Sequence, residues 1–403
     1  MSELYRVQPD SEYISQVMNQ GGESLKKCFQ CATCAVVCTL SPEEHPFPRQ
    51  EMIWAQWGLK DKLTRDPNIW LCHQCNDCST YCPRGAKPGD VLAALRAMTI
   101  QELAFPRFMG QMLRSPALLP LVFIIPAVLL YAVLLITHPG QPFFPPGTIE
   151  FSKLFSHLTL NLFFPTFTGL AALAFLVGAL RLWKSLSGES FSLSRIDFGR
   201  LFFSVIATIQ DILLHRKFKD CTRNRIRYFG HLGVFYGFIG LLITTAVAIV
   251  IIVVNLVAPE MAEGSFLLAY PLPLLHPLKI FGNLSAAALL LGCCLMVYNR
   301  LQTDPQAMRN SYFDWFFLLV VFVVGLTGVA AETMRFVNAP EIAYPVYFTH
   351  LVVIFALLIY SPYSKFAHFV YRTEALIYAR YAEVGAGLKP APTPALAKQL
   401  SEV

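Results

Sequence analysis

The chain has 403 residues, of which 55% are hydrophobic and only 14% are charged, whereas soluble domains usually carry about 25% charged residues. This composition excludes an ordinary soluble globular protein and predicts that much of the chain lies in a membrane. The net charge of +6 does not indicate a nucleic-acid partner, because much of it falls in one segment, 181–227, between apolar runs.

Two cysteine runs with the same spacing occupy the first hundred residues. They are Cys28-x2-Cys31-x2-Cys34-x3-Cys38 and Cys72-x2-Cys75-x2-Cys78-x3-Cys82, and a proline follows only the second. Three closely spaced thiolates can bind three irons of a cubane, and in two-cluster ferredoxins the fourth cysteine of each run ligates the other cluster. We therefore predict two [4Fe–4S] clusters. Cluster 1 takes Cys28, Cys31, Cys34 and Cys82, and cluster 2 takes Cys72, Cys75, Cys78 and Cys38.

Other uses of these cysteines agree less well with the pattern. Disulfides are disfavoured in a cytoplasmic domain, and zinc sites usually contain two CxxC pairs. Between and after the runs, segments 49–63 and 91–103 have apolar residues at helical spacing. The sequence thus predicts an all-helical two-cluster ferredoxin domain over 1–105, in which His73 is not a ligand.

Six apolar runs predict membrane-spanning helices within a membrane domain at 106–385. They lie at roughly 116–137, 158–180, 230–256, 278–298, 315–336 and 345–366. Three prolines in the first run leave open an alternative with five spans. Between spans, segment 198–214 is an amphipathic helix, which either lies on the membrane surface or packs on the ferredoxin domain. The Ala/Pro-rich tail, 386–403, is expected to be disordered.

The orientation follows from charge. The basic segment 181–227 predicts a cytoplasmic loop, which places the ferredoxin domain and the C-terminus on the same side of the inner membrane. The start, MSELYRVQPD, has no signal-peptide pattern.

Four histidines at or inside span ends predict two haems b, because ionisable residues in spans are functional candidates. His350 and His368 are 18 residues apart, which is five helical turns, so both would project from one face of the last span, about 27 Å apart. Topology pairs His231 with His368 on the cytoplasmic side, and His276 with His350 on the outer side. Cys293 and Cys294 lie in the middle of the fourth predicted span and are expected to pack as small hydrophobic residues.

These motifs resemble a known family. The segment CFQCATCAVVC…CHQCNDCSTYCP resembles the small iron–sulfur subunit of heterodisulfide reductase. The membrane half resembles that enzyme's cytochrome b partner and the cytochrome subunit of respiratory nitrate reductase, which shares the 18-residue histidine spacing. The fusion of both halves resembles the C subunits of the quinone-interacting membrane-bound oxidoreductases of sulfate reducers. One departure is Leu241, which stands where the nitrate reductase cytochrome has a second histidine.

The resemblance implies electron exchange between menaquinone in the lipid membrane and cytoplasmic FAD and iron–sulfur subunits that serve adenylylsulfate reductase. It also implies a quinone site near the outer haem, because a lysine lies beside the quinol site of the nitrate reductase cytochrome. The expected site residues are Lys279, His276, Glu332 and Arg335. Two alternatives stay open: a sibling complex serving sulfite or heterodisulfide reduction, and a membrane-anchored iron–sulfur sensor without quinone chemistry.

Overall fold

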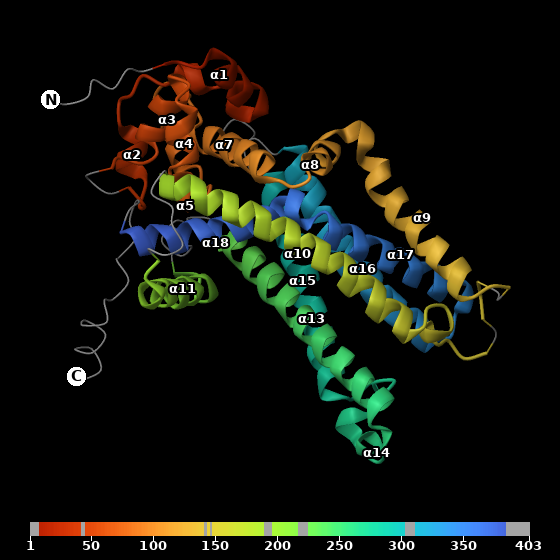
Figure 1. Ribbon diagram of the computed structural model, residues 1–403. Coiled ribbons are helices and arrows are strands. Elements are labelled where there is room, and N and C mark those ends of the chain that lie inside the picture. Colours follow the sequence, from red (N-terminus) through yellow and green to blue (C-terminus); the bar gives the residue numbers. More distant parts are fainter. Residues whose placement is uncertain are drawn as a thin grey trace, which may run out of the picture.

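The structure is a computed structural model that describes residues 8–41, 45–140, 143–145, 147–188, 196–216, 225–302 and 311–383. The predicted tail and Cys221 lie outside these ranges. Every regular element in them is a helix. Figure 1 shows a compact group of short helices at one end of a bundle of long ones.

The N-terminal group of short helices is the region predicted to be a ferredoxin domain, and it is called the head below. Its helices are α1 (Ser11–Val17), α2 (Thr33–Val37), α3 (Arg49–Gln56), α4 (Lys60–Thr64), α5 (Asn68–Leu71), α6 (Asp77–Thr80) and α7 (Pro88–Leu103). The helix expected over 49–63 is broken into α3 and α4. Gly58 lies between them with φ +64°, and a Cβ there would sit 2.3 Å from the carbonyl oxygen of Asp10, so the turn needs glycine.

Six helices are long and apolar enough to cross a membrane, as the sequence predicted. The first comprises a short turn and α9 (Leu119–Thr137). The others are α10 (His157–Ser187), α13 (Arg225–Val257), α15 (Pro277–Gln302), α16 (Tyr312–Val337) and α17 (Pro340–Ile359). The α8 helix (Arg107–Arg114) links the head to α9, and α14 (Pro259–Ala262) is a single turn between α13 and α15.

The prediction for the last span was wrong at its end. The α17 helix stops at Ile359, a 3-10 turn covers Ser361–Tyr363, and a separate helix, α18 (Lys365–Ala382), follows. Pro362 lies in this turn and has no N–H to continue the helical hydrogen bonding. His350 and His368 therefore belong to different helices and do not share one helical face.

The α13 and α15 helices pack together through small residues. A Cβ on Gly237 would lie 2.5 Å from the Leu289 nitrogen, and one on Gly292 would lie 2.5 Å from the Val234 nitrogen. Small residues let two backbones approach closely inside a membrane, where no hydrophobic force drives helices together. In Figure 1 this pair diverges from the other four spans at the end away from the head.

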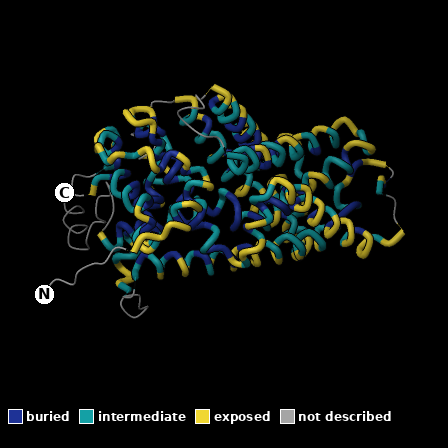
Figure 2. The backbone as a smooth tube through the Cα atoms, turned by 90° about the horizontal axis from the view of Figure 1, so that it is seen from above, coloured by how far each residue is buried: buried dark blue, intermediate teal, exposed yellow. Residues whose placement is uncertain are grey.

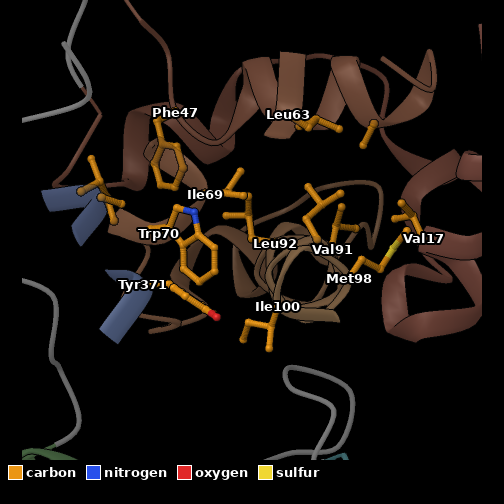
Figure 3. Packing of buried hydrophobic residues seen from close by; sticks show 14 of the residues in the cluster. Val17, Phe47, Leu63, Ile69, Trp70, Val91, Leu92, Met98, Ile100 and Tyr371 are labelled. Atoms are coloured by element: carbon orange, nitrogen blue, oxygen red, sulfur yellow. The ribbon is translucent and has the colours of Figure 1, made fainter. Parts of the chain in front are cut away.

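The core of the head continues into the membrane helices. Its buried cluster includes Trp70 and Leu92 from the head, Leu182 from the end of α10, and Tyr371 and Ala375 from α18. Figure 3 shows the Trp70 indole beside the Tyr371 ring, with the head residues packed around it. Because these side chains share one core, the head is fixed against the ends of α10 and α18.

The amphipathic segment forms α11 (Phe198–Leu213), which packs on α18. Its polar side is buried there: Ser204 and Thr208 are both 0% exposed, and Asp211 forms an ion pair with Arg380. The opposite side carries an exposed apolar stripe of Phe198, Phe202, Ile206, Ile209 and Leu213. Exposed residues also line the outer faces of the long helices in Figure 2, as expected for surfaces that meet lipid.

Candidate functional site

The two cysteine runs fold as copies of one local structure. Gln30 and Ala32 in the first run, like Gln74 and Asn76 in the second, have positive φ values between 53° and 67°. Alternating left-handed residues curl the chain and turn successive peptide N–H groups toward the same side. Each curl leads into a short helix, α2 or α6, which carries the third cysteine of the run.

The fold brings the last cysteine of the second run to the first run. Burial raises the pKa of Cys34 to about 11, and the negative charges of Cys28, Cys31 and Cys82 act in the same direction. Cys82 also acts on Cys28, whose pKa burial likewise raises. Cys82 thus lies within electrostatic reach of the first run, which is the grouping that crossed ligation needs.

In the same way, the last cysteine of the first run, Cys38, lies near the second run. Burial is the largest effect that raises the pKa of Cys78. The negative charges of Cys72, Cys75 and Cys38 raise it further, and that of Cys34 has a smaller effect in the same direction. One cavity is lined by all four cysteines of this set, together with Phe47, Asn76 and Gly89. A Cβ on Gly89 would lie 2.2 Å from the Asn76 side-chain oxygen, so glycine allows α7 to approach this loop.

The donor chemistry of both sets fits a [4Fe–4S] cluster. All eight cysteines are free of disulfides. Within the described ranges no three His, Cys, Asp or Glu side chains converge closely enough to share one metal ion. A cubane requires a different arrangement, because each thiolate binds its own iron and the four sulfurs surround a volume.

Hydrogen bonds to sulfur are present on both loops. The Gln74 N–H donates to Cys72 Sγ at 3.2 Å, and Gln30 Nε2 donates to Cys28 Sγ at 3.4 Å. Cys31 Sγ lies 3.4 Å from the Thr33 hydroxyl, which lowers the pKa of this exposed thiol. Such bonds stabilise thiolates and help to set cluster potentials.

Two arginines from outside the head, one on a membrane span and one on the helix after the last span, hold the second cysteine loop. Arg227 of α13 donates to the carbonyls of Gln74 (2.6 Å) and His73 (2.7 Å). Arg372 of α18 donates to the carbonyls of Cys72 (2.8 Å) and Leu71 (3.1 Å), and its guanidinium also lies against the His73 ring. These charge-assisted bonds tie this loop to the membrane domain.

His368 lies directly beneath the same loop. Its ring stacks on Trp70 at 5.9 Å, two residues before Cys72. Burial lowers the pKa of His368 well below 6.5, with Arg96 and Arg372 adding to the effect, so the imidazole is neutral and able to bind a metal. A cavity beside it is lined by Arg96, Arg114 and Lys365, and the buried Trp70 Nε1 has no hydrogen-bond partner. Of these groups, the three cations that line the cavity with His368 have the charge that the acidic groups of a haem would need.

His231 lies near the start of α13, on the same side of the membrane domain. The α13 and α18 helices meet through Phe235 and Phe369, whose rings are 6.3 Å apart. Arg372 is a charged neighbour of both His231 and His368. The two histidines predicted to form the cytoplasmic pair therefore come from adjoining helices.

His215 lies beside His231, and the sequence pattern did not single it out. His215 Nε2 is 3.3 Å from His231 Nδ1. The residue follows the end of α11 and is only 6% exposed. The sequence shows only that His215 comes directly after an amphipathic helix, and a histidine at such a place is ordinarily expected on the surface.

The two outer histidines have different environments. Thr327 of α16 donates its hydroxyl to the Val323 carbonyl, so its oxygen accepts from His350 Nδ1 at 2.9 Å. The lone pair of His350 is then on Nε2, which suits a metal ligand. His276 is only 3% exposed and acts as a cap instead. Its Nδ1 accepts from the Leu278 N–H at 3.1 Å and its Nε2 donates to the Leu267 carbonyl at 3.2 Å.

Haem ligation by His276 stays a prediction. In this structure both of its ring nitrogens are engaged in hydrogen bonds, and its described contacts do not include His350. The physical reason is that the backbone N–H groups at the start of α15 need acceptors, and Pro277 makes His276 the residue placed to supply one.

Three of the four expected quinone-site residues lie near the start of α15 and the end of α16. Lys279 Nζ lies 3.2 Å from Glu332 Oε1, and both side chains are partly buried, at 17% and 23% exposure. Asn283 donates to the same carboxylate oxygen at 3.1 Å, and it was not predicted. Arg335 lies one turn after Glu332, near Tyr270. His276 is engaged in its cap.

Comparison with known proteins shows what the head is similar to. Residues 24–86 match the 4Fe–4S dicluster domain, so the N-terminal region is a ferredoxin domain of this type. The chain is 38% identical over 87 residues to the C subunit of the H(2):CoB-CoM heterodisulfide,ferredoxin reductase of Methanothermobacter marburgensis, which covers 22% of this chain and 47% of that protein. The chain thus spans about half the length of this relative.

Two further relatives reach into the membrane region by length. The E subunit of the dihydromethanophenazine:CoB–CoM heterodisulfide reductase of Methanosarcina acetivorans is 26% identical over 208 residues, 49% of this chain and 74% of that protein. The citrate utilization protein B of Escherichia coli is 24% identical over 332 residues, 76% of this chain and 80% of that protein. No solved structure matches the chain. Together with the six apolar helices, these similarities describe an iron–sulfur head like the first relative joined to a multi-pass membrane region like the second.

Proposed function

We propose that this chain is the membrane electron-transfer subunit of a quinone oxidoreductase complex. It exchanges electrons between menaquinone and soluble flavin and iron–sulfur subunits on the cytoplasmic side. The observation that carries the proposal is the cavity lined by Cys38, Cys72, Cys75 and Cys78, whose loop is tied by Arg227 to α13 and by Arg372 to α18.

Two [4Fe–4S] clusters and two haems b, when bound, supply one-electron carriers. Cys28, Cys31, Cys34 and Cys82 hold one cluster, and Cys38, Cys72, Cys75 and Cys78 hold the other. His231 and His368 ligate the haem nearer the head. His350 is a ligand of the outer haem, for which we assign no second ligand. Trp70 fills the space between the second cysteine loop and His368, and thereby keeps water out of it.

The quinone site is proposed at Lys279 and Glu332, with Asn283 completing the group. A quinone headgroup needs hydrogen-bond donors to its oxygens and a group that can exchange protons with water. Lys279 supplies a donor, and Glu332 can accept and release a proton at the membrane edge. The orientation, with the head in the cytoplasm, rests on the basic segment between α10 and α13.

We further propose that the soluble partners serve adenylylsulfate reductase, on the resemblance to the oxidoreductases of sulfate reducers. A second candidate is favoured by the similarity to a citrate utilization protein across 76% of the chain. In that case the same electron transfer serves the metabolism of a carboxylic acid. Oxidation of the dithionite-reduced chain, with its partners from the native membrane, distinguishes the two: the oxidant is adenylylsulfate in the first case, and in the second an unsaturated tricarboxylate, whose C=C bond accepts two electrons and two protons.

The cluster assignment is tested with the full-length purified chain. Replacing Cys82 by Ser should alter the electron paramagnetic resonance signal of the cluster that Cys34→Ser also alters, and leave the other signal intact. The matched control is Cys294→Ser, which changes an exposed cysteine in a span. If Cys82→Ser instead alters the signal that depends on Cys78, each run closes its own cluster and the crossed assignment fails.

The haem assignment is tested in parallel. His368→Ala should remove one of two b-type haems, as measured by the pyridine haemochrome absorbance, while His350→Ala should remove the other. A wild-type chain with fewer than two haems would reject the model, and a chain with none would favour the sensor alternative.

A further inference from the structure

His215 is built into the fold as a neighbour of His231. It follows α11, whose polar side is buried against α18, and its backbone has a φ of +49°. The rings of Phe235 and Tyr236 cover the His215 ring at 4.9 and 5.6 Å, which leaves it 6% exposed. A buried histidine in a left-handed conformation is costly, so a specific role is worth seeking.

The hydrogen bonds around His215 define which ring nitrogens carry protons. Its Nδ1 lies 3.2 Å from the carbonyl oxygen of Leu213, which can only accept. His215 Nδ1 therefore carries the proton, and in the neutral ring Nε2 is an acceptor. His231 Nδ1 lies 3.3 Å from this acceptor and is therefore the donor of the pair. His231 is then the Nδ1–H tautomer, with its lone pair on Nε2.

We propose that His215 is a positioning residue that orients the imidazole of His231 and holds it in the tautomer that presents Nε2 to haem iron. This inference rests on the proposed function, in which His231 is a haem ligand. Histidine ligands commonly donate their second ring N–H to an acceptor, which fixes the ring and increases its basicity as a ligand. Here the acceptor is another histidine, supplied by the turn that follows α11.

The outer ligand follows the same rule with a different partner. His350 Nδ1 donates to Thr327, whose hydroxyl is itself directed to a helix carbonyl. A neutral imidazole is a stronger base than a hydroxyl, so His215 makes His231 the more electron-rich of the two ligands. A more electron-rich ligand favours ferric over ferrous iron, which lowers the reduction potential of the haem that it binds.

The test compares His215→Phe with His215→Gln in the full-length chain. Phenylalanine fills the space but cannot accept the His231 proton, whereas the glutamine side-chain oxygen can. If His215→Phe lowers the preference for ferric iron tenfold, the midpoint potential of the inner haem rises by about 59 mV, and its low-spin ferric resonance shifts. His215→Gln should stay close to the wild type, and the control His138→Phe, at the outer end of α9, should change neither.

Each outcome decides the inference. Equal shifts in the Phe and Gln variants, or no shift in either, would overturn it. Loss of the inner haem from His215→Phe but not from His215→Gln would support it, and loss from both would count against it. Nitrogen NMR of the haem-free chain should also show His231 protonated on Nδ1, and a proton on Nε2 would contradict the argument. Failure of the proposed function is separate, since it would appear as His231→Ala retaining both haems.

Discussion

Gly237 offers the most direct test of how α13 is held in the membrane. Replacing it by alanine adds a Cβ that would lie 2.5 Å from the Leu289 nitrogen and 2.7 Å from the Ser285 carbonyl oxygen. Both are backbone atoms of α15, so they cannot rotate away. Ordinary contacts begin at 3.4 Å, and the helices must therefore separate by about 0.9 Å, which is the difference between 3.4 and 2.5 Å.

The cost of this separation can be estimated. Overpacking in a well-packed interface costs roughly 1–3 kcal/mol, while alanine gains up to about 1 kcal/mol over glycine in helix propensity. Gly169→Ala is the matched control, because it lies in α10 and its Cβ would meet nothing within 4 Å. We expect Gly237→Ala to be less stable than Gly169→Ala by about 2 kcal/mol, roughly a 30-fold change in the folded-to-unfolded ratio.

The assay is reversible unfolding of the purified chain by titration of sodium dodecyl sulfate into mild detergent micelles, followed by circular dichroism. Both variants should start from the same helix content. If Gly237→Ala proves as stable as Gly169→Ala, the α13–α15 contact tolerates separation, and the close approach of the two backbones does not stabilise this pair.

Three further predictions concern the site and the head. Lys279→Leu should slow haem reduction by a menaquinol analogue at least tenfold with haem content unchanged. The control Lys153→Leu, which breaks the exposed pair with Glu150, should not slow it. Equal reduction rates in the two variants would move the quinone site elsewhere. Arg372→Met leaves two loop carbonyls without their donors, so the cluster held by Cys78 should be lost faster in air than in the wild type, with Arg372→Lys intermediate; identical loss rates would contradict this. Burial raises the pKa of both Glu51 and Asp66, so the folded head binds more protons than the unfolded chain. The stability of the head should therefore fall as pH rises above 4.5, by a few kcal/mol at most. Glu51→Gln keeps a donor to Asp66 and should flatten this pH dependence in thermal unfolding scans, and an unchanged slope would refute the prediction.

Much of the fold could be predicted because its signals are local. A run of apolar residues long enough to span the bilayer is visible in the sequence, and the cysteine spacing determines which thiols share a loop. The last span shows where this reasoning fails. The 18-residue interval between His350 and His368 equals five helical turns only if the helix is continuous, and Pro362 ends it. Pro362 was the feature of the sequence that could have predicted the end of this helix.

The candidate site was less predictable because it depends on contacts between distant segments. His276 could have been interpreted as a cap, since it directly precedes Pro277 at the start of a helix. His215 carries no comparable signal, because its contact with His231 arises from the turn after α11. The crossed thiol sets remain a prediction, although the cavity lined by Cys38 and the second run has the composition that they require.

The core that the head shares with α10 and α18 has a consequence for biosynthesis. Trp70 leaves the ribosome early, but the Tyr371 ring that covers it is made about three hundred residues later, after all six spans. Domains near an N-terminus generally fold first during synthesis. Here the N-terminal residues cannot complete their core until the last helix has been translated, so membrane insertion precedes completion of the head. Iron–sulfur cluster delivery to the second cysteine loop is therefore expected to be a late step of assembly, and truncation before α18 should yield a membrane-inserted chain with an unfinished head.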